Sequence, residues 1–300
     1  MDRARTAGAA AAGVTVLLWA SAFVGIRAAG EELSPGPLTL GRLLVAAVVL
    51  GALVSLRGDA LPGRAAIPRL LACGLLWFGA YNVLLNAGEQ QVDAGTAAML
   101  VNVGPVFVAA LAGVLLNEGF PRPLVAGCGI ALAGTTVIGL ASTGGGVDAG
   151  SGALLCVAAA AAYAGGVVAQ KPLLERTSAL QITFLACVIG AVACLPVAPA
   201  LAGEVADAPG GAIGWTVYLG VFPTAVGFTT WAYALARTSA GRLGATTYLV
   251  APITVVLGWT MLGETPPALA FAGGALCLAG VAVTRGLRLP ALRPRPAAAG

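Results

Sequence analysis

Apolar stretches of about twenty residues recur along the whole chain, separated by short segments that hold charged residues, proline or glycine. Runs of this length are typical of membrane-spanning helices, because a helix satisfies its own backbone hydrogen bonds in lipid. Strands of an outer-membrane barrel would instead alternate over about ten residues. The pattern predicts an all-α integral membrane protein with ten transmembrane helices, at about residues 8–28, 37–56, 67–88, 94–116, 123–141, 152–170, 179–202, 212–235, 243–262 and 267–285.

The composition supports a membrane protein, since 16 basic and 12 acidic residues make up only 9% of the 300. Soluble domains are about 25% charged, so a soluble enzyme, a disordered chain and a nucleic-acid binder are excluded. The chain has no histidine, and its single lysine, Lys171, precedes a proline, so no phosphate-binding loop can be written. The six cysteines all fall in apolar runs without the spacing of a metal site. We therefore expect no catalytic residue, no metal and no cofactor.

The basic residues predict the orientation of the chain. With a cytoplasmic N-terminus, fourteen of them fall on the inner side, Arg27 falls on the outer side, and Arg42 lies inside a span. Such a positive-inside bias predicts that both termini are cytoplasmic in a multi-pass cell (inner) membrane protein. The start of the chain also resembles a secretory signal with a cleavage site at Ala20-Ser21-Ala22. We favour an uncleaved helix, because the apolar run continues to about Ala29.

A glycine-rich connector, residues 142–151, divides the chain into halves of five spans each, residues 7–141 and 152–285, followed by a cytoplasmic tail at 286–300. Because five is odd, the second half must enter the membrane inverted relative to the first, as in inverted-repeat transporters. The halves also correspond in sequence. Pro105 precedes Glu118 by 13 residues in the fourth span, and Pro252 precedes Glu264 by 12 in the ninth.

The sequence resembles the EamA family of the drug/metabolite transporter superfamily. The resemblance lies in the run from Gly220 to Glu264, in WASAFVGIRAA from Trp19 and in PLTLGRLLVAA from Pro37. It implies a ten-helix carrier with a central substrate cavity, found most often in bacterial inner membranes. It also implies export of amino acids, other metabolites or toxic compounds.

Neutral polar residues within the predicted helices are candidates for the cavity lining. Asn82, Asn86 and Glu89 follow the i, i+4, i+7 spacing of one helix face, and Asn102 lies one turn before Pro105. Each asparagine either lines the cavity or hydrogen-bonds a neighbouring helix. We therefore take Asn82, Asn86 and Asn102 as candidate substrate-binding residues.

Aromatic residues are the second group of candidates. Trp215 and Trp259 lie toward helix ends and are typical of an interfacial belt, whereas Trp19, Trp77 and Tyr163 lie near span centres. The central rings either pack between helices or face the cavity. Trp19, with Ser21 beside it, and Tyr163 are taken as candidates for substrate binding.

Two prolines predict breaks in the helices. Pro105 and Pro252 lack a backbone N–H, which leaves the carbonyls of Val101 and Tyr248 without their helical partner. Such carbonyls line substrate sites in transporters with broken helices, which makes Tyr248 a further candidate. The alternative is a kink that only shapes packing.

Charged residues inside the predicted spans are few. Arg42 is interpreted as architectural, either reaching the outer headgroups or bonding carbonyls at a helix end. Glu118 and Glu264 lie at helix ends, where capping explains them, so we expect no deeply buried carboxylate for a proton relay.

The sequence thus predicts a secondary transporter that is no enzyme. We expect it to export a small neutral or zwitterionic organic metabolite, amino-acid-like or drug-like, through a central cavity. An importer or passive facilitator on the same scaffold remains open, and a membrane-embedded lipid enzyme is a remote alternative. The expected partners are a small-molecule substrate and the lipid bilayer, without nucleic acid. A homodimer is compatible with the sequence, which does not determine the oligomeric state.

Overall fold

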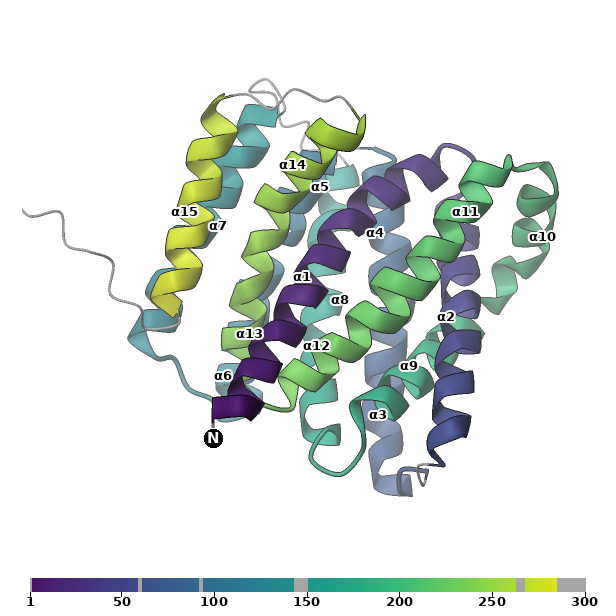
Figure 1. Cartoon of the computed structure of the whole chain (residues 1–300), viewed down its shortest axis with the longest axis horizontal. Coiled ribbons are helices and arrows are strands. Elements are labelled where there is room, and N and C mark those ends of the chain that lie inside the picture. Colours follow the sequence, from purple (N-terminus) through teal and green to yellow (C-terminus); the bar gives the residue numbers. More distant parts are fainter. Residues whose placement is uncertain (1, 59–60, 92–93, 143–150, 263–267, 285–300) are drawn as a thin grey trace, which may run out of the picture.

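A computed structural model describes residues 2–58, 61–91, 94–142, 151–262 and 268–284, and these residues fold into helices joined by short loops (Figure 1). The first half holds α1 (Asp2–Gly30), α2 (Pro35–Arg57), η1 (Arg64–Ala66), α3 (Ile67–Cys73), η2 (Gly74–Ala80), α4 (Tyr81–Glu89), α5 (Ala94–Val101), α6 (Gly104–Leu115) and α7 (Arg122–Ser142). The second holds α8 (Ser151–Leu173), α9 (Ala179–Cys194), η3 (Leu195–Val197), α10 (Ala198–Asp207), α11 (Gly210–Leu219), η4 (Gly220–Val226), α12 (Gly227–Leu235), α13 (Ala240–Thr246), η5 (Thr247–Leu249), α14 (Val250–Leu262) and α15 (Ala268–Thr284).

Seven helical stretches of the described residues are long and apolar enough to cross a membrane: Thr6–Gly30, Pro35–Arg57, Arg64–Glu89, Ser151–Leu173, Ala179–Asp207, Gly210–Leu235 and Ala240–Met261. Each overlaps one predicted span. The other three predicted spans contain the shorter apolar helices Gly104–Leu115, Arg122–Val137 and Phe271–Thr284. The all-helical class is therefore confirmed, whereas the number ten stays a prediction. The predicted connector at 142–151 and the tail at 286–300 lie almost wholly outside the described residues.

Matched irregularities interrupt the helices of the two halves. The third span contains the π-helical turn η2, and the eighth contains η4, each seven residues long and followed by a nine-residue α-helix. Each π-turn begins at a glycine packed against the opposite half. A Cβ at Gly74 would lie 2.6 Å from Ile189 Cβ, and a Cβ at Gly220 would lie 2.6 Å from Val45 Cβ. Each π-turn thus packs closely on a helix of the opposite half, η2 on α9 and η4 on α2.

The helix is irregular just before each of the two prolines, with a turn in the fourth span and a 3₁₀ segment within a continuous helical stretch in the ninth. In the fourth span, α5 ends at Val101 and α6 begins at Gly104, with Pro105 in its first turn. In the ninth, α13 ends at Thr246, the 3₁₀ turn η5 follows, and Pro252 lies in the first turn of α14. The N–H groups of the first helical turn have no partner within the helix, so a proline loses nothing by lacking one there. Each α-helix therefore begins again one to two residues before its proline.

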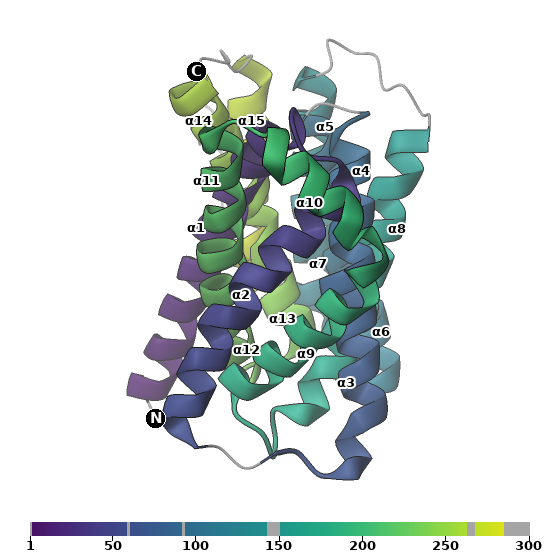
Figure 2. The same cartoon turned by 90° about the vertical axis from the view of Figure 1, so that its right-hand side faces the viewer.

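The packing of the halves against each other follows the same correspondence. α1 packs against α12 and α14 of the second half, and α8 packs against α4 and α6 of the first. α7 and α15, the last helices of the two halves, lie side by side at one edge of the molecule (Figure 1), and α2 contacts α9 (Figure 2). The centre of the structure is therefore built from elements of both halves.

Candidate functional site

A small pocket lies between the two helix breaks. Its volume is about 40 Å³, and its lining comes from α1, α4, α5 and the turn after it, α8, η5 and the start of α14: Trp19, Phe23, Tyr81, Ala98, Val101, Asn102, Tyr163, Thr247 and Val250. We call it the central pocket. A water molecule occupies about 30 Å³ and ligand pockets span roughly 300–1,000 Å³. This conformation is therefore nearly closed around the pocket.

Three of the predicted site residues meet at the central pocket. Trp19, Asn102 and Tyr163 all line it, although they come from α1, the break after α5, and α8. Asn102 lies in the break itself, and Thr247 lies in η5 on the other wall. Both interrupted helices thus contribute a polar side chain to the same small volume.

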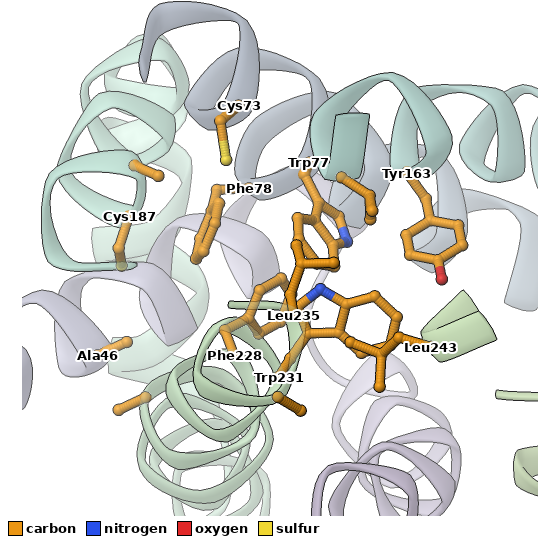
Figure 3. Packing of buried hydrophobic residues seen from close by; sticks show 14 of the residues in the cluster. Ala46, Cys73, Trp77, Phe78, Tyr163, Cys187, Phe228, Trp231, Leu235 and Leu243 are labelled. Carbon is orange, nitrogen blue, oxygen red and sulfur yellow. The ribbon is translucent and has the colours of Figure 1, made fainter. Parts of the chain in front are cut away.

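A cluster of aromatic rings packs directly against the central pocket. The Trp19 ring stacks on Trp231 with centroids 5.0 Å apart, and Trp77 contacts Phe228 at 4.9 Å and Tyr163 at 5.5 Å. Figure 3 shows the rings of Trp77, Phe228 and Trp231 converging, with Tyr163 at the side of the cluster. Trp77 and Trp231 are fully buried. These side chains belong to one close-packed core cluster that also includes Ala112 of α6 and Leu235 of α12.

Trp19 links the pocket to the π-turn of the second half. Its indole Nε1 donates a hydrogen bond to the backbone oxygen of Pro223 in η4, at 3.3 Å. Gly227 allows this approach, because a Cβ there would lie 3.0 Å from the same nitrogen. The polar atom of Trp19 thus has a structural partner, and its ring borders the central pocket.

Other predicted site residues lie outside the central pocket. The Ser21 hydroxyl contacts the Leu18 oxygen and the Tyr218 hydroxyl, at 2.8 and 2.7 Å. Asn82 donates to the oxygens of Trp77 and Phe78, so it satisfies carbonyls of the π-turn η2. Neither residue borders the pocket.

Tyr248 and the prolines shape the structure around the pocket. Tyr248 is fully buried and packs beside α7 and α15, in a cluster with Leu124, Cys128, Ala131, Ala245 and Val281. It lies next to Thr247 in η5 but does not line the pocket. Pro105 and Pro252 also do not line the pocket. Each lies in the first turn of an α-helix, α6 or α14, and the irregular segment just before that helix contributes a residue to the lining.

Arg42 is buried inside the protein, so the expectation that it reaches the outer headgroups is wrong. It is 3% exposed, and its Nε donates to Thr224 Oγ1 at 3.0 Å. Thr224 in turn donates to the Leu219 oxygen, five residues earlier, at 2.7 Å. The threonine hydroxyl thus bridges the guanidinium to the carbonyl of the last residue of α11, which has no α-helical donor because the residue four positions later is Pro223.

Charged side chains cap helices at the end of the molecule that the charge bias predicts to be cytoplasmic. The Glu118 carboxylate accepts hydrogen bonds from the backbone nitrogens of Ala240 and Gly241, at 2.7 and 3.1 Å, at the start of α13. Lys171 Nζ donates to the oxygens of Leu235 and Thr238, at 2.6 and 2.7 Å, at the end of α12. Both contacts are favourable, because the negative carboxylate lies at the positive N-terminal end of a helix dipole and the ammonium lies at the negative C-terminal end of another. The capping interpretation of Glu118 is confirmed, and Glu264 lies outside the described residues.

A larger cavity opens at the opposite end of the molecule. It measures about 530 Å³ and lies between α1, the following loop, α2 and α4, lined by Ile26, Arg27, Gly30, Glu31, Leu38, Asn86, Glu89, Gln90 and Gln91. We call it the α1–α4 cavity. Asn86 lines this cavity rather than the central pocket. Glu89 is 8% exposed, so the expectation that no carboxylate is deeply buried is wrong.

Comparison with known proteins identifies the class. The sequence profile of the EamA-like transporter family matches the chain twice, at residues 6–140 and 150–286. The chain belongs to this family. It is therefore a multi-span membrane transporter of a small molecule and not an enzyme, as the sequence predicted.

Several curated relatives match most of the chain. A probable terminal-alkyne amino-acid exporter of Streptantibioticus cattleyicolor is 41% identical over 268 residues, covering 89% of this chain and 90% of that protein. An uncharacterized transporter of Bacillus subtilis is 32% identical, covering 89% and 87%. A probable amino-acid metabolite efflux pump of Salmonella typhimurium is 26% identical, covering 89% and 91%. A crystal structure with 20% identity and a TM-score of 0.77 covers 94% of this chain and 97% of that one, and it shares the fold.

Sequence reasoning missed several residues of the site. Trp231 and Phe228 lie in the run that carries the family resemblance, but their positions in the predicted eighth span gave no sign that they pack at the centre of the protein. Tyr81 and Thr247 line the central pocket and were not singled out. Tyr81 directly precedes the predicted polar stripe of α4, so an aromatic next to that stripe was the available signal.

Proposed function

We propose that this transporter exports a small neutral or zwitterionic organic metabolite with the character of an amino acid, and that the substrate passes through the central pocket. The observation that carries the proposal is the position of the pocket between the two helix breaks, one in each half. Interrupted helices of this kind place free backbone groups beside a substrate in transporters. The names of two relatives, which refer to amino-acid export and amino-acid metabolite efflux, support the substrate class.

The lining of the central pocket favours a substrate without strong net charge. Within the part of the chain that the structure describes, its walls contain aromatic rings, aliphatic side chains, Asn102 and Thr247, and no acidic or basic side chain. A phosphorylated or strongly cationic substrate would need a compensating charge there, because unpaired charge at that depth is costly.

We further propose ten spanning helices arranged as two inverted repeats, residues 7–141 and 152–285, with both termini in the cytoplasm. The matched π-turns, the matched breaks and the double match to the family profile support this arrangement. In this orientation the α1–α4 cavity opens outward, and the aromatic cluster and the Glu118 cap close the cytoplasmic side. The central pocket itself is nearly closed in this conformation, and export requires the aromatic cluster to part in an inward-facing state.

Topology is testable with reporter fusions. Fusions after Arg122 and after Arg288 should report the cytoplasm, and a fusion within residues 144–150 should report the outside. A cytoplasmic signal from that connector would contradict the inverted-repeat arrangement.

Transport is testable with the purified full chain in vesicles. We expect counterflow exchange of labelled L-propargylglycine, a terminal-alkyne amino acid, and of neutral L-amino acids, and we expect Trp19→Ala to abolish it. Trp259→Ala, a change at a half-exposed ring near a helix end, is the matched control. No exchange of any amino acid would refute the substrate class. Direction follows from metabolite levels in cells with and without the gene: accumulation in the medium supports export, and uptake identifies an importer.

A further inference from the structure

The wall of the α1–α4 cavity holds a buried carboxylate that has no hydrogen-bond partner among the described residues. Glu89 lies at the end of α4, is 8% exposed and lines the cavity, and neither of its carboxylate oxygens has a hydrogen-bond partner among the described residues. Burying a charged group without partners costs several kcal/mol or more, so such a group marks a functional site rather than a packing element.

Asn86 adds a second buried oxygen without a partner to the wall of the same cavity. Its Nδ2 donates to Thr39 Oγ1 at 2.9 Å and to the Pro35 oxygen at 3.3 Å. A backbone carbonyl only accepts, so the amide nitrogen must face α2 and Oδ1 must face the other way. This oxygen is buried without a partner. Asn86 and Glu89 are three residues apart and lie on one face of α4.

The surrounding helices hold these two side chains in place. Gln90 Nε2 donates to the Gly30 and Leu33 oxygens, at 3.3 and 3.5 Å, which ties the end of α4 to the α1–α2 loop. On its other side α4 packs on α8, since a Cβ at Gly88 would lie 2.6 Å from Cys156 Sγ. The acceptor oxygens therefore belong to a supported wall and not to a mobile surface.

A cationic side chain lies across the same cavity. Arg27, near the end of α1, is exposed and contributes to the lining of the same 530 Å³ volume as Glu89. One wall thus holds three buried acceptor oxygens without protein partners, and another offers a guanidinium. Opposite charges on two walls match a ligand that carries an ammonium and a carboxylate on one small frame.

We infer that the α1–α4 cavity is a binding subsite for a zwitterion, in which Glu89 and Asn86 accept the hydrogen bonds of a primary ammonium group and Arg27 faces the ligand's carboxylate. The inference rests on the proposed function and names an entry or exit subsite for the α-amino-acid group, separate from the central pocket. An ammonium has three donors, which the two Glu89 oxygens and Asn86 Oδ1 suffice to accept once their side chains turn from their buried positions toward the cavity.

Binding to the detergent-purified full chain tests the subsite. The probes are L-propargylglycine, its N-acetyl derivative, which lacks the ammonium, its amide, which lacks the carboxylate, and butylammonium chloride. Wild type should bind the free amino acid about 10- to 100-fold more tightly than the N-acetyl derivative, as charge-assisted hydrogen bonds predict. Glu89→Gln should abolish that preference and weaken butylammonium binding by a similar factor.

Two further variants separate recognition from folding. Glu31→Gln removes a carboxylate from the same cavity and should keep the wild-type preference. Arg27→Gln should weaken the free amino acid but leave the amide unchanged. The inference is overturned if Glu89→Gln retains the wild-type preference for ammonium probes, if Glu31→Gln loses it equally, or if wild type binds no ammonium probe.

The vesicle assay distinguishes this inference from the proposed function. Amino-acid exchange in a protein whose ammonium preference does not depend on Glu89 would refute the subsite and leave the function standing. Butylammonium binding that depends on Glu89, in vesicles that exchange no amino acid, would leave the subsite standing and refute the proposed substrate class.

Discussion

Gly220→Ala should destabilise the protein by driving apart two helices from opposite halves. The added methyl carbon would lie 2.6 Å from Val45 Cβ, 2.7 Å from Val45 Cγ1 and 2.8 Å from the Arg42 backbone oxygen. Carbon–carbon contacts prefer roughly 3.5–4.0 Å, so η4 and α2 must separate by about 1 Å. Two of the three obstacles are a Cβ and a backbone oxygen, which cannot move without their helix.

The magnitude follows from the general cost of overpacking. Inserting one methyl group into a filled interior costs about 1–3 kcal/mol, which exceeds the gain of about 0.5–1 kcal/mol that alanine brings to a helix interior relative to glycine. The net destabilisation should be about 0–2.5 kcal/mol, with about 1 kcal/mol at the centre of the range. At about 2–4 °C per kcal/mol, the midpoint of thermal unfolding should fall by a few degrees.

Gly214→Ala in the preceding helix α11 is the matched control, because a Cβ there would meet nothing within 4 Å. This change should leave the unfolding midpoint unaltered or raise it slightly. The assay is thermal unfolding of both purified variants in one detergent, followed by loss of monodisperse protein. Equal midpoints for the two variants would refute the packing of η4 on α2 as the reason for the glycine.

Thr224→Val should remove the hydroxyl that binds the buried guanidinium of α2 and should lower stability by about 1.5–3 kcal/mol in thermal unfolding, whereas Thr229→Val, which loses only a hydrogen bond within its own helix, is the control. Glu118→Gln should weaken the cap of α13 by about 0.5–2 kcal/mol while transport continues both with and without an imposed proton gradient; selective loss of transport driven by that gradient, with exchange intact, would give that residue another role. Pro105→Ala and Pro252→Ala should both impair transport in protein that stays monodisperse, because a continuous helix would remove the breaks beside the central pocket. Wild-type transport in both proline variants would leave these residues as architecture alone.

The sequence alone determined the features that depend on one segment at a time. Apolar runs of spanning length predicted the helices, because lipid allows few other backbone structures. The prolines predicted where the fourth and ninth spans break, since proline lacks the donor that a continuous helix needs. The capping role of Glu118 could be predicted from its place at a helix end. The helix that it caps, α13, could not be predicted from the sequence.

The tertiary structure alone decided which segments those residues meet. The partner of Arg42 is Thr224, 182 positions away, and no local pattern relates the two. The three polar residues of α4 share one face as predicted, yet Asn82 binds the π-turn behind it while Asn86 and Glu89 border a cavity. A π-turn adds a residue to the helix and rotates the faces before and after it relative to each other, so helical periodicity could not relate Trp77 to that face. Periodicity shows which residues share a face, and only the packing of the ten predicted segments shows what that face meets.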